Sequence, residues 1–150
     1  MHTIRRASIE DLDIIVSLFD AYRVFYKKES DLNGAKNFIG SRLNNNESTI
    51  FLAFNESNKA VGFIQLYPLF SSTRMARLWL LNDLYVDKAN RRKGIAKELL
   101  ERAKEFSRET NARGFFLETG VDNMGANALY PAVGMTLNDD HNFYYWNVVD

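Results

Sequence analysis

Apolar residues recur at two spacings along the chain, and these spacings predict its helices and strands. A spacing of three to four residues is typical of a helix with one apolar face, and it occurs at residues 12–26, 31–43, 95–106 and 126–130. Short runs rich in β-branched and aromatic residues predict strands at residues 3–6, 49–54, 60–67, 77–86, 114–119 and 143–148. The predicted order is β-α-α-β-β-β-α-β-α-β. We therefore expect an α/β fold in which a mixed sheet carries helices on both faces.

Polar residues between these runs mark the ends of elements. Ser8 and Asp11 have the spacing of a capping box and predict the start of the first helix. Residues 55–59 form a polar turn between two predicted strands, which is typical of a hairpin. Asp122 is the expected N-cap of the last helix, which Pro131 and Gly134 would end. Neither a repeat nor a low-complexity linker divides the sequence, so we predict one domain over residues 1–150.

The composition narrows the chemistry that the chain can perform. It is 46% hydrophobic and 25% charged, which is typical of a soluble globular domain. The 19 basic and 19 acidic residues give a net charge of zero, so no nucleic-acid partner is expected. With no cysteine in the sequence, disulfides, thiolate zinc sites and a cysteine nucleophile are excluded. Neither GxSxG nor HExxH occurs, so we expect neither a serine hydrolase nor a metal site.

The hydropathy pattern bears on location. No run of about 18 apolar residues is present, so no membrane partner is expected. The first residues lack the apolar run of a signal peptide, which favours a cytoplasmic protein. His2 and His141 have no neighbours in sequence that indicate metal binding or catalysis. Chemistry must then come from carboxylates, tyrosines, backbone donors and a bound cofactor.

The segment that enters the third predicted helix contains the strongest functional signal. A strand runs through a short loop into a helix that Gly94 opens. Amides at a helix N-terminus have no intrahelical partner and favour a bound phosphate, which glycine allows to approach closely. Four basic side chains surround this start: Arg91, Arg92, Lys93 and Lys97. They oppose the helix dipole, and a bound polyanion would compensate them. On the residues alone, a solvated helix start remains the alternative.

Motifs in this segment and beyond it resemble the GNAT superfamily of N-acetyltransferases, which bind acetyl-CoA. Arg91-x-x-Gly94-x-Ala96 is similar to its Arg/Gln-x-x-Gly-x-Gly/Ala signature, and Asn82-Asp-Leu-Tyr-Val86 resembles the strand before that signature. Asn123-x-x-Ala126-x-x-Leu129-Tyr130, followed by Gly134-Met135, resembles the helix after the next strand. The resemblance covers essentially the whole chain and implies the GNAT fold, with a central, mostly antiparallel sheet. It looks nearest to the branch of diamine and small histone-type acetyltransferases.

The resemblance implies where acetyl-CoA binds. Backbone amides from Arg92 to Ala96 would hold the pyrophosphate, and Arg91 or Arg92 would reach the adenosine phosphate. The strand would carry a bulge at 84–86, where its free backbone groups pair with the pantetheine arm. The amide of Leu84 would polarise the thioester carbonyl. The residues implied to bind the cofactor are Leu84, Tyr85, Val86, Arg91, Arg92, Lys93, Gly94, Ile95, Ala96, Lys97, Asn123 and Tyr130.

Two of these residues follow the next strand, and each has a structural alternative. Asn123 would hydrogen-bond the cofactor arm, but it could equally be a helix cap beside Asp122. Tyr130 would lie near the CoA sulfur and act as a catalytic acid, although a lone tyrosine on a short helix is usually a packed aromatic. Pro131 departs from the family pattern, which leaves the position of Tyr130 open.

The acceptor site is implied at the end of the first helix. Tyr22, Phe25 and Tyr26 are expected to line it, because an aromatic cluster can hold a cationic amine. Simple packing of an amphipathic helix is the alternative. Diamine acetyltransferases often carry a carboxylate where this chain has Asn82, and an amide cannot act as a base. Asp83 is therefore the expected catalytic base and acceptor contact, with a structural role as the alternative; Glu118 on the neighbouring predicted strand is the second choice.

Together these observations predict an enzyme, an acetyl-CoA-dependent N-acetyltransferase that releases CoA. The acceptor would be a primary amine, either a small molecule or an amino group of a peptide or protein, and it would attack directly in a ternary complex. The alternative is an acetyl-CoA-binding sensor or regulatory domain without turnover. A nucleotide-binding protein is disfavoured because neither phosphate-loop motif occurs. We also expect a homodimer.

Overall fold

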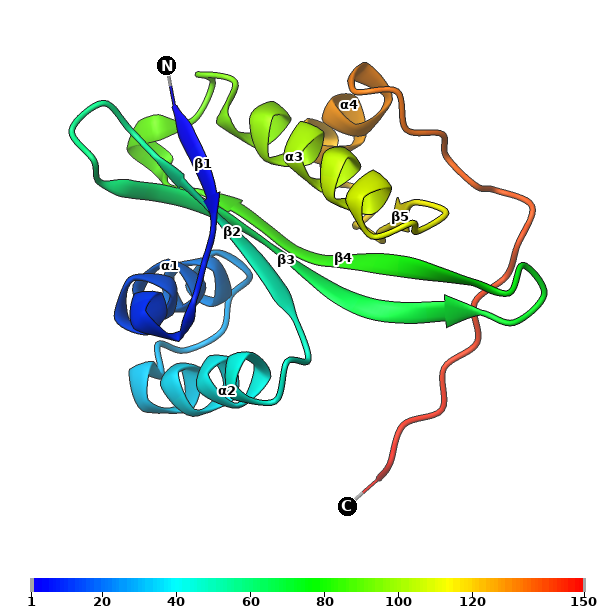
Figure 1. Ribbon diagram of the computed structural model, residues 1–150, viewed down its shortest axis with the longest axis horizontal. Coiled ribbons are helices and arrows are strands. Elements are labelled where there is room, and N and C mark those ends of the chain that lie inside the picture. Colours follow the sequence, from blue (N-terminus) through cyan, green and yellow to red (C-terminus); the bar gives the residue numbers. More distant parts are fainter. Residues whose placement is uncertain (1, 150) are drawn as a thin grey trace. The chain divides into compact units, whose positions relative to one another are not determined.

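Five strands form one sheet in the order in which they follow along the chain, in a computed structural model that describes residues 2–149 (Figure 1). The strands are β1 (Thr3–Arg6), β2 (Thr49–Phe54), β3 (Ala60–Ser71), β4 (Ala76–Val86) and β5 (Phe115–Phe116). The pairs from β1 to β4 are antiparallel, whereas β5 is parallel to β4. The mixed, mostly antiparallel sheet is therefore confirmed.

Helices cover both faces of this sheet, as predicted. The helices of the described chain are α1 (Leu12–Phe25), α2 (Leu32–Asn44), α3 (Ile95–Glu109) and α4 (Met124–Ala132), with short 3₁₀ turns at Ile9–Asp11 and Lys88–Asn90. Figure 1 shows α1 and α2 on one face of the sheet and α3 on the other. Among the described residues, no helix is both long and apolar enough to cross a membrane.

Local hydrogen bonds begin the first two helices where the sequence predicts. The Ser8 amide donates to Asp11 Oδ2 across 2.9 Å, as in a capping box. The Asp31 side chain accepts from the Gly34 amide across 2.8 Å and caps α2. A Cβ at Gly34 would lie 2.3 Å from the Asp31 carboxylate, so the cap requires glycine there.

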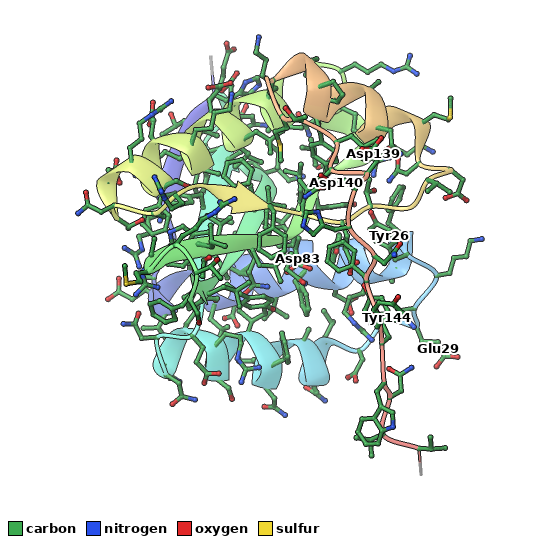
Figure 2. The ribbon with its side chains drawn as sticks, turned by 90° about the vertical axis from the view of Figure 1, so that its right-hand side faces the viewer. Tyr26, Glu29, Asp83, Asp139, Asp140 and Tyr144 are labelled. Atoms are coloured by element: carbon green, nitrogen blue, oxygen red, sulfur yellow. The ribbon has the colours of Figure 1, made fainter. Side chains whose placement is uncertain are left out.

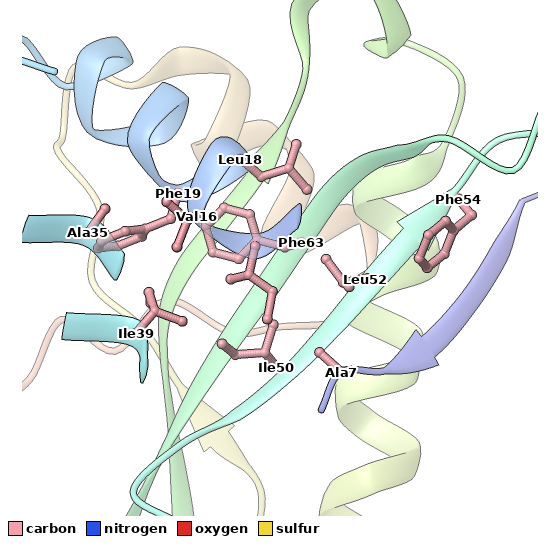
Figure 3. Close-up of a cluster of buried hydrophobic side chains, with 11 residues drawn as sticks. Ala7, Val16, Leu18, Phe19, Ala35, Ile39, Ile50, Leu52, Phe54 and Phe63 are labelled. Carbon is pink, nitrogen blue, oxygen red and sulfur yellow. The ribbon is translucent and has the colours of Figure 1, made fainter. Parts of the chain in front are cut away.

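The main core lies between the sheet and the pair α1 and α2 (Figure 3). Alternate residues of β2 and β3 point to this face, as the two-residue period of a strand requires. They meet the apolar stripes of the two helices. The buried members of this cluster are Ala7, Ile15, Val16, Leu18, Phe19, Ala35, Ile39, Ile50, Leu52, Phe54 and Phe63.

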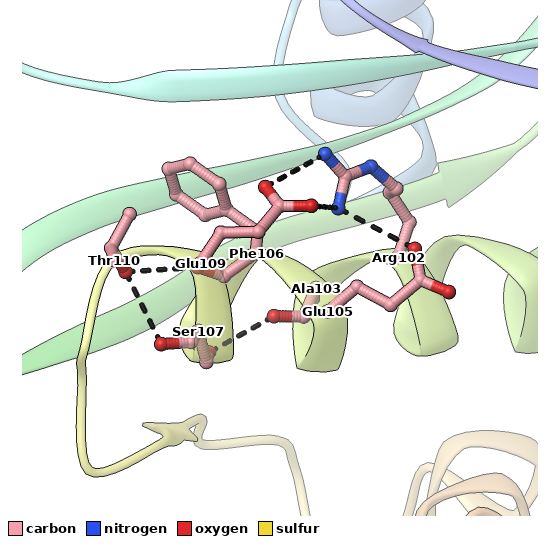
Figure 4. Close-up of polar contacts among 7 residues, drawn as sticks. All are labelled: Arg102, Ala103, Glu105, Phe106, Ser107, Glu109 and Thr110. Atoms are coloured by element: carbon pink, nitrogen blue, oxygen red, sulfur yellow. Dashed lines mark hydrogen bonds and ion pairs between the residues drawn. The ribbon is translucent and has the colours of Figure 1, made fainter.

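The apolar face of α3 packs on the opposite side of the sheet. Phe106 makes an edge contact with Phe51, and their ring centres are 5.4 Å apart. The ring centres of Phe106 and Trp79 are 4.8 Å apart. The polar side of the helix is tied by Arg102, which pairs with Glu105 and Glu109 (Figure 4). The start of α3 follows the end of β4 after eight residues, 87–94, and this loop is where the cofactor is predicted to bind.

The chain divides into two compact units, residues 1–118 and 119–150. The first contains the whole sheet with α1, α2 and α3, and the second contains α4. In the second unit, residues 133–149 form neither helix nor strand. A single domain over residues 1–150 stays a prediction.

Several element boundaries differ from those predicted. No strand forms at residues 143–148, so that prediction was wrong: the side chains of Tyr144 and Trp146 are 90% and 85% exposed. A strand requires a partner backbone, which an aromatic pattern does not supply. β5 is shorter than the predicted 114–119. β3 continues through Pro68, which is tolerated because β2 pairs with β3 only as far as Leu66.

The last helix is also longer than predicted. It includes Pro131, and Asn123 caps it in place of Asp122, because the Asn123 side chain accepts from the Ala126 amide across 3.2 Å.

Candidate active site

A β-bulge in β4 sets the direction of the functional side chains. Leu81 pairs with Leu66 and Asp83 pairs with Gln65, so Asn82 is an extra residue opposite β3. An extra residue reverses the alternation of side chains beyond it. Asp83 therefore points to the face that α1 and α2 cover, instead of the face under α3. The shift lies just before the stretch 84–86 where the resemblance implied it.

Asp83 is the centre of a buried polar cluster. It is 3% exposed and Gln65 is fully buried. Gln65 Nε2 donates to Asp83 Oδ2 across 2.5 Å, and Asn82 Nδ2 donates to Oδ1 across 3.2 Å. The other end of the amide, Gln65 Oε1, has no hydrogen-bond partner within the described residues. The carboxylate thus lies in the interior, where two amide groups donate to it and no cation of the described residues pairs with it.

Burial changes the proton affinity of this cluster. It raises the pKa of Asp83, and the hydrogen bonds from Gln65 and Asn82 offset only part of the rise. Burial and the nearby Asp83 also raise the pKa of Tyr67 to about 12, and that of Tyr22 as well. Both phenols therefore stay protonated at neutral pH. A carboxylate with a raised pKa is a better proton acceptor, which suits a general base.

The aromatic residues predicted to line the acceptor site do come together. Tyr22 makes edge contacts with Tyr26 and Phe63, with ring centres 5.0 and 5.9 Å apart. Its hydroxyl donates to the backbone oxygen of Asn82 across 3.4 Å. Tyr22 is the most buried of the three residues. About half of the surface of Phe25 and of Tyr26, at the end of α1, is exposed. Figure 2 shows Asp83 and Tyr26 among the side chains. The cluster therefore extends from the buried carboxylate to the surface.

Within the described residues, the last part of β4 pairs with a neighbouring strand along one edge only. β5 pairs with β4 only at Trp79 and Leu80. Asp87 N donates to Val61 O on β3, and amides alternate between the two edges of a strand. The amides of Leu84 and Val86 therefore point away from β3, to the edge that β5 leaves open. The backbone role predicted for Leu84 stays a prediction.

The loop between β4 and α3 is shaped by two left-handed residues. Arg92 has φ 63° and Gly94 has φ 82°, and a Cβ at Gly94 would meet nothing within 4 Å. The first intrahelical bond runs from Glu98 N to Gly94 O. The amides of Ile95, Ala96 and Lys97 therefore have no helical partner, as in any first turn. The loop thus presents unpaired amides and open space where the sequence predicts a phosphate.

The basic side chains of this loop have different surroundings. Arg91 Nε donates to Val86 O across 2.9 Å, and its guanidinium lies 4.8 Å from the Phe25 ring centre and 5.7 Å from that of Tyr85. Lys93 Nζ donates to Asn90 Oδ1 across 3.4 Å. The remaining two predicted cations, Arg92 and Lys97, are exposed. Arg91 therefore ties the loop to β4 and α1.

The remaining predicted site residues lie elsewhere along the chain. Asn123 and Tyr130 belong to the second unit, where Asn123 caps α4 and the half-buried Tyr130 lies within that helix. Their catalytic and cofactor roles stay predictions. Glu118, the second-choice base, is exposed and follows the end of β5 by two residues.

Gln65 and Tyr67 share the face of Asp83, and neither was predicted as a site residue. Gln65 is a single polar residue in an otherwise apolar strand, Ala60–Tyr67. A buried polar side chain requires a polar partner, so a lone glutamine in an apolar strand could have indicated a polar cluster in the interior.

Comparisons with known proteins point to one family of enzymes. The sequence matches the model of the acetyltransferase (GNAT) family over residues 14–135. It is 41% identical over 145 residues to the uncharacterized N-acetyltransferase YhfO of Bacillus subtilis, with 97% of each chain covered. The crystal structure of a probable acetyltransferase is 38% identical, with a TM-score of 0.93 over 99% of each chain.

A more distant structure resembles the chain in fold. It is a predicted acetyltransferase from Clostridium acetobutylicum, solved with acetyl-CoA. The two are 18% identical, with a TM-score of 0.77 over 97% of this chain and 96% of that one.

Proposed function

The chain belongs to the GNAT family of acetyltransferases, and we propose that it transfers acetyl from acetyl-CoA to a primary amine by direct attack in a ternary complex. GNAT acetyltransferases use acetyl-CoA. The observation that carries the proposal is the buried Asp83 carboxylate, which the bulge at Asn82 turns towards the aromatic residues at the end of α1.

The residues present fit acetyl-CoA. The left-handed Gly94 leaves open space beside the unpaired amides that begin α3, which suits a pyrophosphate. Arg92, Lys93 and Lys97 add positive charge around these amides. The free edge of β4, with the amides of Leu84 and Val86, suits an extended amide-containing arm, which would pair as an added strand does. Asn123 and Tyr130 are proposed as further contacts.

When bound, acetyl-CoA supplies the thioester whose carbonyl carbon forms a bond to the amine nitrogen as its bond to sulfur breaks. The chain's own residues would then place charges and protons. The Leu84 amide would stabilise negative charge on the carbonyl oxygen. Asp83 would accept the proton that the amine loses. Tyr130 would donate a proton to the leaving sulfur.

A primary amine requires such a base. A lysine-like amine has a pKa near 10.4, so only about one molecule in 10³ is neutral at pH 7. A carboxylate with a raised pKa can take the proton more readily than an ordinary aspartate. Tyr22, Phe25 and Tyr26 would hold the incoming cation against their ring faces.

The test is release of free thiol from acetyl-CoA across a panel of primary amines, polyamines and peptides. Hydrolysis without any amine is the baseline. The proposal expects amine-dependent release and an acetylated product. Tight binding of acetyl-CoA without release on any acceptor would instead support the sensor interpretation.

A further inference from the structure

Gln65 and Asp83 lie directly opposite each other on β3 and β4, and the surroundings of the glutamine fix its side chain. Gln65 is fully buried, and so are its neighbours in β3, Ile64 and Leu66. Side chains alternate along a strand, so Gln65 shares with Phe63 the face that α1 and α2 cover. Phe63 is packed in the main core of that face. The glutamine amide therefore has a defined place beside the Asp83 carboxyl.

The two oxygens of that carboxyl have different partners. Oδ2 accepts from Gln65 Nε2 across 2.5 Å, and this donor belongs to a side chain without exposed surface. Oδ1 accepts from Asn82 Nδ2 across 3.2 Å, and Asn82 is exposed. A long hydrogen bond from an exposed side chain is readily exchanged for one to a ligand, whereas a short buried bond is not. Oδ2 is therefore anchored, and Oδ1 is the oxygen that an incoming group can engage.

Stability does not explain why Gln65 and Asp83 are paired. In the part of the chain that the structure describes, the buried Gln65 Oε1 has no hydrogen-bond partner. Replacing both members of a buried polar pair by apolar groups of the same shape is often neutral or stabilising. Apolar residues at both positions, like the neighbours of Gln65 in β3, would therefore fold at least as well. The glutamine contributes a donor for an ionised carboxylate.

The surroundings of Asp83 otherwise contain little that favours its charge. The titratable groups that face it are Tyr22 on α1 and Tyr67 on β3, and both phenols are neutral at neutral pH. Arg42 on α2 acts on Tyr67, but it pairs with Glu47 across 3.3 Å. No Lys or Arg of the described chain forms an ion pair with Asp83. Hydrogen bonds to the carboxylate are then what opposes the effect of burial, and the shorter one comes from the glutamine.

We propose that Gln65 is the positioning residue of the acetyl-transfer site: it holds Asp83 Oδ2, so that Oδ1 is the oxygen that takes the proton of the acceptor amine. This inference rests on the proposed function, in which Asp83 is the base. The amine nitrogen forms its bond to the thioester carbon, and its proton passes to Oδ1. The sulfur leaves with the electron pair of the broken bond. Oδ2 of the neutral carboxyl still accepts from Gln65.

The glutamine amide itself can test this pairing in the ligand-free protein. Gln65 is the only glutamine in the sequence, so protein with isotope-labelled glutamine gives the signals of one side-chain amide in an NMR spectrum. The bond from Nε2 weakens when the carboxylate is protonated, because a charged acceptor forms the stronger hydrogen bond. The amide signal should therefore move with pH as Asp83 titrates, and it should stop moving in Asp83→Asn. This test needs no substitution of Gln65, and a signal that does not respond to pH in the wild type overturns the proposal.

Gln65→Met tests the role of the donor in catalysis. It retains an unbranched side chain of similar length and removes the hydrogen bond that favours the charged carboxyl, so the pKa of Asp83 should rise further. With the best amine of the panel, the acid limb of the pH profile of kcat/KM should move up by about one pH unit. Below this limb kcat/KM should fall by about tenfold, with unchanged acetyl-CoA affinity in calorimetry.

Leu66→Met is the matched control for this variant. Leu66 is the next residue of β3 and is also fully buried, but its side chain points to the opposite face of the sheet. The control should leave the acid limb in place. A limb that stays in place in Gln65→Met as well overturns the proposal.

A double variant shows whether Gln65 acts through Asp83. In the Asp83→Asn background, Gln65→Met should change kcat/KM by less than about twofold, because the carboxylate that the glutamine holds is gone. Equal losses in the two backgrounds would mean a purely structural glutamine and would overturn the proposal. If the wild type transfers acetyl to no amine, the proposed function is wrong instead. The pH response of the glutamine signal would still show whether Gln65 binds the Asp83 carboxylate.

Discussion

Gln65 Nε2 lies 2.5 Å from Asp83 Oδ2, and the Oε1 atom of the same amide has no partner among the described residues although it is fully buried. The pair is thus only partly satisfied inside the protein. Such a cluster is costly, because the low dielectric that strengthens a hydrogen bond also penalises an unpaired polar group. The cluster therefore lowers the stability of the fold. Proteins retain such destabilising groups mainly at functional sites, and Asp83 lies in the candidate active site.

Asp83→Asn should therefore lower activity while making the protein more stable. Because burial raises the pKa of Asp83, this carboxyl contributes most stability when protonated, and the contribution is lost as pH rises through that pKa. The asparagine carries no charge and should raise the melting temperature at pH 7. Its kcat/KM should fall most at pH values between the pKa of Asp83 and that of the amine, where the wild type has an ionised base and the amine is mostly protonated. Thermal melts and a pH–rate profile measure both effects.

A structural aspartate would behave in the opposite way. If Asp83→Asn melts at a lower temperature and its pH–rate profile overlays that of the wild type, Asp83 is structural and the base is another group or water.

Gly94→Asp should weaken acetyl-CoA binding sharply. It places a side chain and a negative charge in the open space beside the amides that begin α3. Gly134→Asp is the matched control, because Gly134 has φ 84°, close to the 82° of Gly94, and also has open space around it. Both variants incur the same backbone strain. Calorimetry with acetyl-CoA should show a loss only for Gly94→Asp, and equal affinities would exclude the proposed phosphate site.

Tyr130→Phe should lower kcat by about 10²–10⁴-fold, the usual contribution of general acid catalysis, with little change in acetyl-CoA affinity. The phenyl ring retains the packing of the tyrosine and removes only its hydroxyl. Tyr144→Phe, at a side chain that is 90% exposed, is the control. A kcat within a few-fold of the wild type would remove Tyr130 from the mechanism.

Asp11→Asn should destabilise the protein at neutral pH. Hydrogen bonds from Arg5, at 2.7 and 2.9 Å, lower the pKa of Asp11 from 3.8 to about 2. A lowered pKa means that the stabilisation is present above pH 4 and is lost as pH falls towards 2. At pH 7 it corresponds to at most about 2 kcal/mol. Urea unfolding at pH 7 and near pH 2 measures this difference.

Asp13→Asn supplies the comparison for that measurement. Asp13 pairs with Lys36 across 3.1 Å, but its side chain is 86% exposed, and such surface pairs contribute little. It should leave the free energy of unfolding nearly unchanged at both pH values. An equal loss in the two variants would mean that the Asp11–Arg5 pair has no special role.

The sequence predicts most of the fold because its signals are local. The apolar stripe of α3 and the capping box of Ser8 and Asp11 depend on residues three or four positions apart. The prediction of a strand at 143–148 was wrong because strand formation is not a local property. Its aromatic residues fit a strand, but a strand exists only when another backbone is aligned with it, and spacing along one segment does not contain that information.

The candidate site also combines features that neighbouring residues predict with features that depend on contacts between distant segments. Gly94 and its basic neighbours are adjacent in sequence, so a motif indicates them. The pairing of Gln65 with Asp83 depends on the register between β3 and β4 and on the extra residue at Asn82. Nothing in the residues 81–84 marks a bulge, and without it Asp83 would point to the other face of the sheet. Its orientation therefore became evident only from the structure.

The adjacent residues Arg91 and Arg92 should have separable roles, although the sequence gives no way to assign them. Arg91 donates to Val86 O and covers the rings of Phe25 and Tyr85, so Arg91→Gln should lower the melting temperature. Arg92 is exposed, so Arg92→Gln should leave the melting temperature unchanged. It should instead weaken acetyl-CoA binding, and the loss should shrink as salt rises, because screening reduces an exposed charge contact. Thermal melts and calorimetry at low and high salt separate the two effects. Weaker binding in Arg91→Gln at unchanged stability, with no effect in Arg92→Gln, would instead identify Arg91 as the phosphate contact.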